Sequence, residues 1–164
     1  MRGVESLVAF GRSIKNTFDD SFEPPPQADW LEPPEHASYD LQTTGEETTL
    51  VNLDDGAHAW LDRAHQASRF RLGVVVTLEV WLAWDATPPQ PDSHLVVHIG
   101  EHRVGTLDRG ATERLRPVMT TAATLDELPR TRAQLVRLAR PHRPFLLAIR
   151  VPRSGQLRGR SAAV

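Results

Sequence analysis

The sequence predicts an α+β fold, with a small, mainly antiparallel β-sheet or partly open barrel, one or two helices, and a disordered, acidic, Pro-rich N-terminal segment. Three patterns support this prediction. Residues 69–85 alternate apolar and polar positions, residues 94–108 have the pattern of a hairpin, and an apolar helical stripe follows Asp108. With 164 residues, 40% of them hydrophobic, the chain is long enough for one domain with tails.

The first 18 residues have the spacing of a short amphipathic helix. Their apolar positions lie three or four residues apart: Val4, Leu7, Phe10, Ile14 and Phe18. Such a helix could pack on the domain or contact a partner, and the same residues could also be disordered. The few charges of the segment argue against binding to a membrane surface.

Residues 19–48 are acidic and Pro-rich, which predicts a linker or tail. The stretch EPPPQADWLEPPEHA contains five Pro, and Pro favours extended polyproline geometry. Trp30 lies between the two Pro clusters. It either pins the tail onto the domain, or the stretch from Pro24 to Pro34 binds a protein partner through it. The folded domain is then expected over residues 49–152.

A helix and a long strand open this domain. Asp54 or Asp55 can cap a helix whose inward side consists of Ala57, Trp60, Leu61 and Ala64. Residues 69–85 follow as a strand. Its apolar face consists of Val74, Val76, Leu78, Val80, Leu82 and Trp84, and we expect it to be buried on that side only.

A loop and a hairpin come next. Residues 85–93, DATPPQPDS, contain three Pro and cannot lie inside a strand. The hairpin turns at Gly100 and Glu101, and a leading Gly is typical of a type II′ turn. The predicted pairs are Ile99–His102, Val97–Val104 and Leu95–Thr106 on the core face, and His98–Arg103, Val96–Gly105 and His94–Leu107 on the outer face. Gly105 has no side chain and allows another segment to approach closely.

Asp108 can cap a second helix. Its inward positions are Ala111, Leu115, Met119 and Ala122. We expect Pro117 to kink or split this helix near Arg116, because proline lacks the N–H of the helical hydrogen bond. The sequence TLDEL, residues 124–128, offers a capping box for one further turn.

The last third contributes two strands and a tail. Residues 130–139 have a composition typical of a helix, but their position in the chain favours a strand that enters the sheet. We predict a strand there. Residues 144–152 alternate in a way that predicts a strand with Phe145, Leu147, Ile149 and Val151 inward. Residues 153–164 are basic and are expected to be disordered.

The residue inventory argues against an enzyme. No Cys is present, which excludes disulfides, thiol nucleophiles and Cys-based metal sites. His94 and His98 would lie about 13 Å apart on a strand, and His102 lies on the opposite face. His58 and His65 would lie about 10 Å apart on a helix. We therefore predict no catalytic site, no metal and no cofactor.

The chain also lacks an apolar run of the length that crosses a membrane, which is about 20 residues. Its N-terminus does not resemble a signal peptide. We therefore expect a cytoplasmic protein.

Residues 93–119, SHLVVHIGEHRVGTLDRGATERLRPVM, resemble the core hairpin of the HIRAN module. The shared pattern is an apolar strand, a tight turn, Val-Gly with an apolar residue, and a helix with Ala and a late Pro. The matching positions are Val96, Ile99, Val104, Gly105, Leu107, Ala111 and Pro117. Thr106 stands where the module often has an aromatic residue. The resemblance implies a small β-barrel with an inserted helix, and recognition of DNA ends in helicase and repair proteins.

Charge is distributed unevenly along the chain. Residues 1–65 carry 13 acidic and 4 basic side chains, and residues 66–164 carry 8 acidic and 15 basic ones. Two interpretations stay open. The acidic part folds back and screens the basic part, or the basic part forms a binding face for nucleic acid or an acidic partner.

The second interpretation predicts a ligand-binding face on the outer side of the sheet. Its residues are Trp81, His98, Arg103, Arg130, Arg132 and Arg137. The arginines would bind phosphates, and the outward Trp81 would stack on a base. The sequence thus predicts a non-enzymatic binding module, for nucleic acid as a DNA end or single strand. The alternative is a protein-interaction or regulatory domain that uses the Pro-rich tail.

Overall fold

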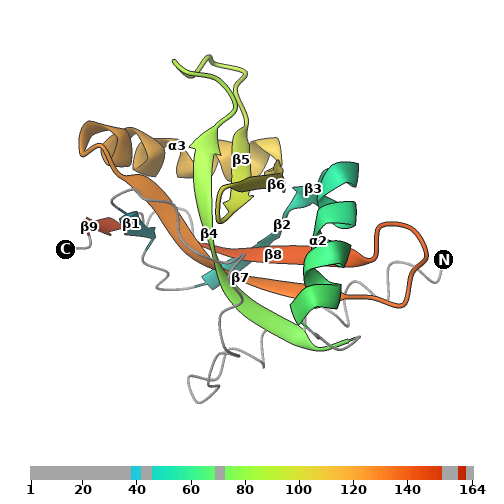
Figure 1. The fold of residues 1–164 in the computed structure, drawn as a ribbon. Helices are drawn as coiled ribbons and strands as arrows, with labels where there is room; N and C mark the ends of the chain where they lie inside the picture. Colours follow the sequence, from blue (N-terminus) through green and yellow to red (C-terminus); the bar gives the residue numbers. More distant parts are fainter. Residues whose placement is uncertain (1–37, 42–45, 69–72, 153–158, 162–164) are drawn as a thin grey trace.

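The computed structural model describes residues 38–41, 46–68, 73–152 and 159–161. In these ranges the chain forms nine strands and two helices (Figure 1). In chain order they are β1 (Ser38–Leu41), β2 (Glu46–Leu50), β3 (Asn52–Leu53), α2 (Asp55–Ser68), β4 (Val75–Trp84), β5 (Leu95–Ile99), β6 (His102–Thr106), α3 (Arg109–Thr124), β7 (Leu128–Arg137), β8 (Phe145–Pro152) and β9 (Gly159–Ser161). The predicted α+β class is confirmed.

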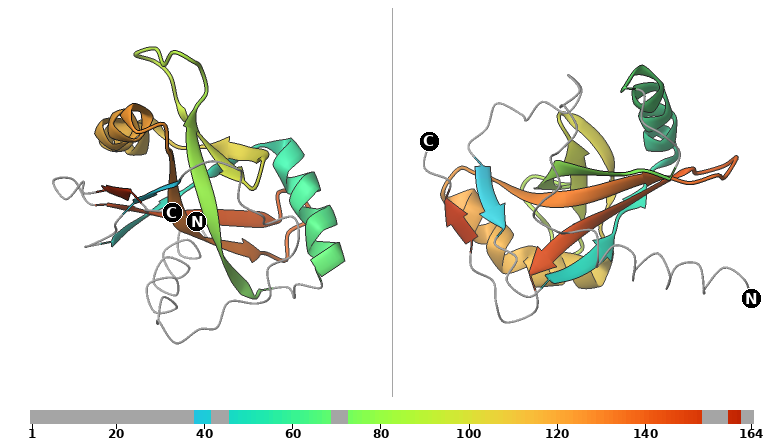
Figure 2. Two further views of the ribbon diagram at one scale, coloured as in Figure 1. Left: turned by 60° about the vertical axis from the view of Figure 1, so that its left-hand side comes forward. Right: turned by 90° about the horizontal axis from the view of Figure 1, so that it is seen from below.

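The sheet curls until its two edges nearly meet (Figure 2). Its strands lie in the order β2-β8-β7-β4-β5-β6-β3, and neighbours in this order are antiparallel. β2 pairs with β8 at one edge and β3 pairs with β6 at the other, although only Val51 separates β2 from β3. A single stretch of chain therefore joins both edges, and the result is the small, partly open barrel that the sequence predicts.

Apolar side chains fill the inside of this barrel. The predicted core is confirmed at seven positions, none more than 6% exposed: Val76, Leu78, Val80, Val97, Val104, Leu147 and Ile149. Burial of an aliphatic side chain of this size contributes about 1.5–3 kcal/mol. The alternation that places these residues inward also places the polar residues of the same strands on the outer face.

Both helices begin where the sequence predicts. The Asp108 carboxylate accepts a hydrogen bond from the N–H of Ala111 at 2.8 Å, which caps α3. The carbonyl of Asp54 accepts a hydrogen bond from the N–H of Ala57 at 3.0 Å at the start of α2. α3 packs beside β7 and α2 beside β6, so the helices cover different parts of the barrel (Figures 1 and 2).

Of the kink or split expected at Pro117, the split does not occur, because α3 runs through this residue as one helix. Proline removes one helical hydrogen bond, but the flanking Val118 and Met119 are buried in the core. Their burial holds the two turns around Pro117 together.

The further helical turn expected in TLDEL is also not formed. Thr124 is the last residue of α3, and its hydroxyl donates to the carbonyl of Thr121 at 2.6 Å. Asp126 follows with a left-handed φ of 56°. This conformation cannot continue a right-handed helix, so the chain turns directly into β7.

The β5–β6 hairpin turns where predicted, but its register shifts after two pairs. The observed pairs are Ile99–His102, His98–Arg103, Val97–Gly105 and Val96–Thr106. Val104 is the extra residue of a β-bulge, so the predicted pairing of Val97 with Val104 and every pair beyond it are wrong. The shift also buries Leu107 in the core, where Thr106 was expected.

Several predicted boundaries are corrected. The folded part starts before residue 49, because β1 and β2 lie largely within the predicted linker 19–48. The predicted strand over residues 69–85 is shorter, since β4 begins at Val75 and Val74 is 44% exposed. In the predicted tail 153–164, residues 159–161 form β9, which pairs with β1.

The other two strands of the last third are confirmed. Residues 130–139 were predicted as a strand, and β7 covers most of them. The four inward positions predicted for residues 144–152 are all buried in the core, on β8. The predicted helix over residues 1–18 and the Pro-rich stretch with Trp30 lie outside the described residues.

Candidate functional site

Ion pairs join the acidic N-terminal part of the chain to its basic C-terminal part. Seven salt bridges occur among the described residues, and five of them link residues before 66 with residues after it. These five are Asp40–Arg130, Glu47–Arg114, Asp54–Arg103, Asp55–Arg143 and Asp62–Arg137. The acidic part therefore folds back and screens much of the basic part, which is the first of the two interpretations of the charge distribution.

Four of the six predicted site residues nevertheless form a continuous row across four strands. Arg130 on β7 pairs with Trp81 on β4, Trp81 pairs with His98 on β5, and His98 pairs with Arg103 on β6. Side chains of directly opposite residues share one face of a sheet, and strands lie about 4.8 Å apart. The row is thus about 14 Å long on the outer face.

Trp81 is on the predicted face but is not exposed. Only 3% of the residue is accessible to solvent. The alternation along β4 was predicted correctly, whereas the expectation that the indole is free to stack on a base is wrong. An aromatic face must be accessible for base stacking.

His98 occupies the middle of the row and is half-buried. Burial lowers its pKa, because a partly dehydrated site disfavours the charged imidazole. The positive charge of Arg103 lowers the pKa further, while a backbone hydrogen bond involving Glu101 acts in the opposite direction. The lowered pKa favours the neutral imidazole at pH 7.

Arg132 joins this face, and Arg137 does not. Arg132 lies two residues from Arg130 on β7, directly opposite Glu79, and is exposed. Arg137 falls on the other alternation of β7. Its guanidinium donates to the carboxylate of Asp62 on α2 at 3.0 Å. The prediction that all six residues share one face is therefore wrong for Arg137.

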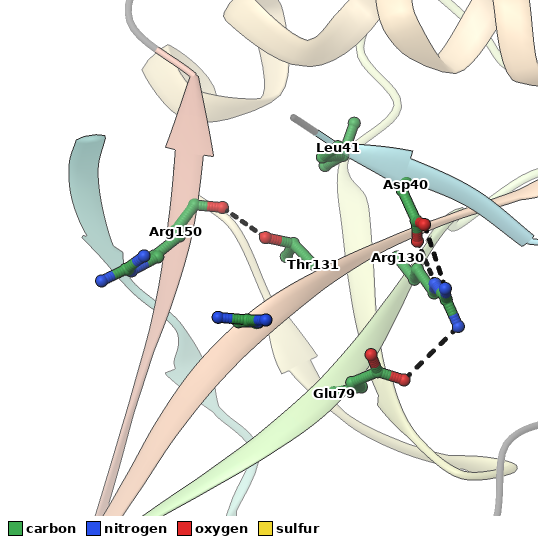
Figure 3. A pocket seen from close by; sticks show the side chains of 7 residues that line it. Asp40, Leu41, Glu79, Arg130, Thr131 and Arg150 are labelled. Atoms are coloured by element: carbon green, nitrogen blue, oxygen red, sulfur yellow. Dashed lines mark hydrogen bonds and ion pairs between the residues drawn. The ribbon is translucent and has the colours of Figure 1, made fainter. Parts of the chain in front are cut away.

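Arg130 is the most strongly held member of the row. Its Nε and Nη2 both donate to the Asp40 carboxylate, and its Nη1 lies 3.6 Å from a carboxylate oxygen of Glu79. The hydrogen bonds with Asp40 raise the pKa of Arg130. Figure 3 shows the guanidinium between the two acids. This geometry fixes the side chain at the end of the row.

A cavity opens beside Arg130, where the sheet forks. β7 pairs with β8 as far as Ala133–Ile149, and then with β1 at residues 128–130. At the fork, the Thr131 hydroxyl donates to the carbonyl of Arg150 at 2.7 Å. The cavity has a volume of about 300 Å³. It is lined by Asp40, Leu41, Glu79, Arg130, Thr131, Arg132 and Arg150 (Figure 3).

Sequence reasoning missed part of this cavity for two different reasons. Arg150 alternates with the inward residues Ile149 and Val151, so its place on the outer face was implicit in the predicted strand. Asp40 could not be found, because the four residues of β1 were assigned to the linker.

No group of three His, Asp or Glu side chains that could hold a metal ion occurs in the part of the chain that the structure describes. Within the same ranges, neither helix has the length and apolar character needed to cross a membrane. No family model, curated protein or solved structure matches this chain.

Proposed function

We propose that this domain is a non-enzymatic module that binds nucleic acid through the outer face of its sheet. The observation that carries the proposal is the row from Arg130 to Arg103, which runs unbroken over four neighbouring strands. It crosses the hairpin that resembles the HIRAN module. A phosphate backbone laid along the row would meet cations at both ends and a histidine between them.

The ion pair at the Arg103 end of the row is weak enough for a phosphate to replace it. Arg103 and Asp54 lie 3.5 Å apart, and about half of each side chain is exposed. An exposed pair of this kind contributes about 0.2–1 kcal/mol. A phosphate, which accepts strong charge-assisted hydrogen bonds from arginine, can therefore replace the carboxylate.

The burial of Trp81 limits the kind of contacts that this face can make with a nucleic acid. With the indole covered, binding depends on phosphate contacts rather than on base stacking. Phosphate contacts carry little sequence preference, and they weaken steeply as salt rises because counterions are released on binding. Low sequence specificity and a strong salt dependence are thus expected.

Fluorescence anisotropy tests this function. The full chain is titrated with labelled single- and double-stranded DNA and RNA at about 50 and 200 mM salt. We expect binding at the lower salt that weakens by at least tenfold at the higher one. Arg103→Ala should weaken binding. The matched control Arg140→Ala, an exposed arginine of the β7–β8 loop, should leave binding unchanged.

Absence of binding at the lower salt would reject the nucleic-acid proposal. The alternative would then be a protein-interaction domain that uses the stretch from Pro24 to Pro34 with Trp30. Equal losses for Arg103→Ala and Arg140→Ala would show that only net charge matters, and would reject the row as the binding surface.

A further inference from the structure

We infer that the cavity at the fork of β7 is a binding site for a single oxyanion of the phosphate class. The inference rests on the proposed function, because it names the point where a backbone phosphate would be held. It also goes beyond that function, since the cavity lies next to the row and would take free phosphate as well.

The fork is where this sheet can admit a ligand. Along most of β7, neighbouring strands on both sides cover the backbone. On one side, β4 pairs with β7 through this region, including Val80 with Thr131. On the other side, β8 pairs only with residues 133–137 and β1 only with residues 128–130, so neither strand pairs with Thr131. A side-chain hydrogen bond from the Thr131 hydroxyl takes the place of the regular ladder there.

The charges at the fork favour an anion. Three arginines and two carboxylates line the cavity, which leaves one net positive charge. Asp40 and Glu79 both bind Arg130, so these two acids are already engaged. Arg132 stands opposite Glu79 in the ladder, is exposed, and forms no ion pair with any residue that the structure describes.

Arg132 is therefore the residue that should make the main contact with the oxyanion. Its planar guanidinium can donate two parallel hydrogen bonds to a phosphate, which ammonium groups cannot do. Arg130, fixed by Asp40 on β1 and Glu79 on β4, lines the same cavity and keeps these two carboxylates occupied. The cavity of about 300 Å³ lies at the small end of ligand sites, which suits one phosphate group with its water.

Calorimetric titration of the full chain with sodium phosphate, at constant ionic strength, tests the site. Arg132→Ala should weaken phosphate binding about tenfold, because the charge-assisted hydrogen bonds from the guanidinium are lost. Arg132→Lys should bind phosphate with an affinity between those of the wild type and Arg132→Ala, since lysine keeps the charge but cannot donate two parallel hydrogen bonds. Glu79→Gln should tighten binding by removing a competing carboxylate. Arg140→Ala should match the wild type.

The outcomes separate this site from the proposed function. Phosphate binding that requires Arg132, without any binding of nucleic acid, supports the site and rejects the function. Nucleic-acid binding that Arg132→Ala leaves unchanged supports the function and overturns the site. Equal effects of Arg132→Ala and Arg140→Ala on phosphate binding also overturn it. Because Arg132 is exposed, unchanged thermal unfolding of its variants is expected and serves as the folding control.

Discussion

Gly105 on β6 lies directly against the backbone of Asn52 on β3. A Cβ atom at residue 105 would fall 2.9 Å from the Asn52 carbonyl carbon and even closer to its oxygen. This contact lies at the point where β3 pairs with β6 and the barrel closes. The close approach that a residue without a side chain permits thus lets β3 pair with β6, and because β3 follows β2 in the chain, this pairing closes the barrel.

Gly105→Ala should therefore strongly destabilise the protein. The added methyl group meets backbone rather than a flexible side chain, and overpacking of this kind costs about 1–3 kcal/mol or more. Gly56→Ala is the matched control. A Cβ atom at this α2 position meets nothing within 4 Å, and Ala favours a helix over Gly by about 1 kcal/mol. Urea unfolding of both variants checks the prediction, and a stable Gly105→Ala protein would contradict closure of the barrel through this contact.

Leu78→Ala should cost about 2–5 kcal/mol, because it removes buried methyl groups and leaves a cavity. Leu78 is 6% exposed and belongs to the core inside the barrel. Val74→Ala, at an exposed position just before the same strand, should change stability by less than about 0.5 kcal/mol. Similar midpoints for both variants in urea would show that β4 does not line the core.

Asp108→Ala should destabilise α3 by about 0.5–2 kcal/mol. Its carboxylate accepts the hydrogen bond from the N–H of Ala111 at 2.8 Å, and alanine offers no acceptor. Asp108→Asn keeps an acceptor of the same shape and should lose much less. Thermal unfolding of the two variants measures the difference. If Asn and Ala are equally destabilising, the cap acts through charge and not through its hydrogen bond.

The elements that the sequence predicted best are those with strong local periodicity. The alternation from Val76 to Leu82 suffices for β4, and Asp108 suffices for the start of α3. Local patterns failed where a neighbouring segment decides the outcome. Val104 is bulged out of the pairing between β6 and β5. A glycine inside a strand, here Gly105, often marks a bulge, but the local pattern does not specify where the register shifts. β1 was missed because its four residues, SYDL, are too few for alternation to be recognised.

The same distinction holds for the candidate site. The face of Trp81 follows from alternation, but its burial depends on packing over the outer face. The order of β7, β4, β5 and β6, which aligns Arg130 with Arg103, is a long-range property that no local pattern contains. Ion pairing is long-range as well. The ion pair between Asp40 and Arg130 could not be predicted, because the strand that carries Asp40, β1, was not recognised in the sequence.

Stability should fall as the pH falls below about 6.5. The N–H of Phe145 donates to Nδ1 of His58 at 3.3 Å, which requires a neutral imidazole. Burial, and then the charge of Arg143, lower the pKa of His58, while Asp55 opposes them. A folded pKa below the unfolded value means that this contribution is complete above the unfolded pKa. It is lost as the pH falls through the folded pKa.

Thermal unfolding at pH 7.5 and pH 5 measures this effect. The lowered pKa of His98 acts in the same direction, so the wild type should lose stability from both residues. His58→Gln can still accept from the N–H of Phe145 but does not ionise in this range. It should therefore show a smaller loss than the wild type, and adding His98→Asn should reduce the loss further. A loss as large in the double variant as in the wild type would contradict the assignment.

Asp54 and Arg103 should have opposite effects on nucleic-acid binding if the row is the binding surface. The Asp54 carboxylate lies 3.5 Å from Nε of Arg103 and competes with a phosphate for it. Arg103→Ala should weaken binding and reduce the dependence of log K on log salt by about one unit, the contribution of one phosphate contact. Asp54→Asn should instead tighten binding, because it frees Arg103. Asparagine is as good as aspartate at the start of a helix, so α2 should stay intact. Anisotropy titrations at four salt concentrations provide both the affinity and the slope. A tighter Asp54→Asn complex whose advantage persists when Arg103 is also replaced by Ala would show that Asp54 acts through the general field of the protein and not through the row.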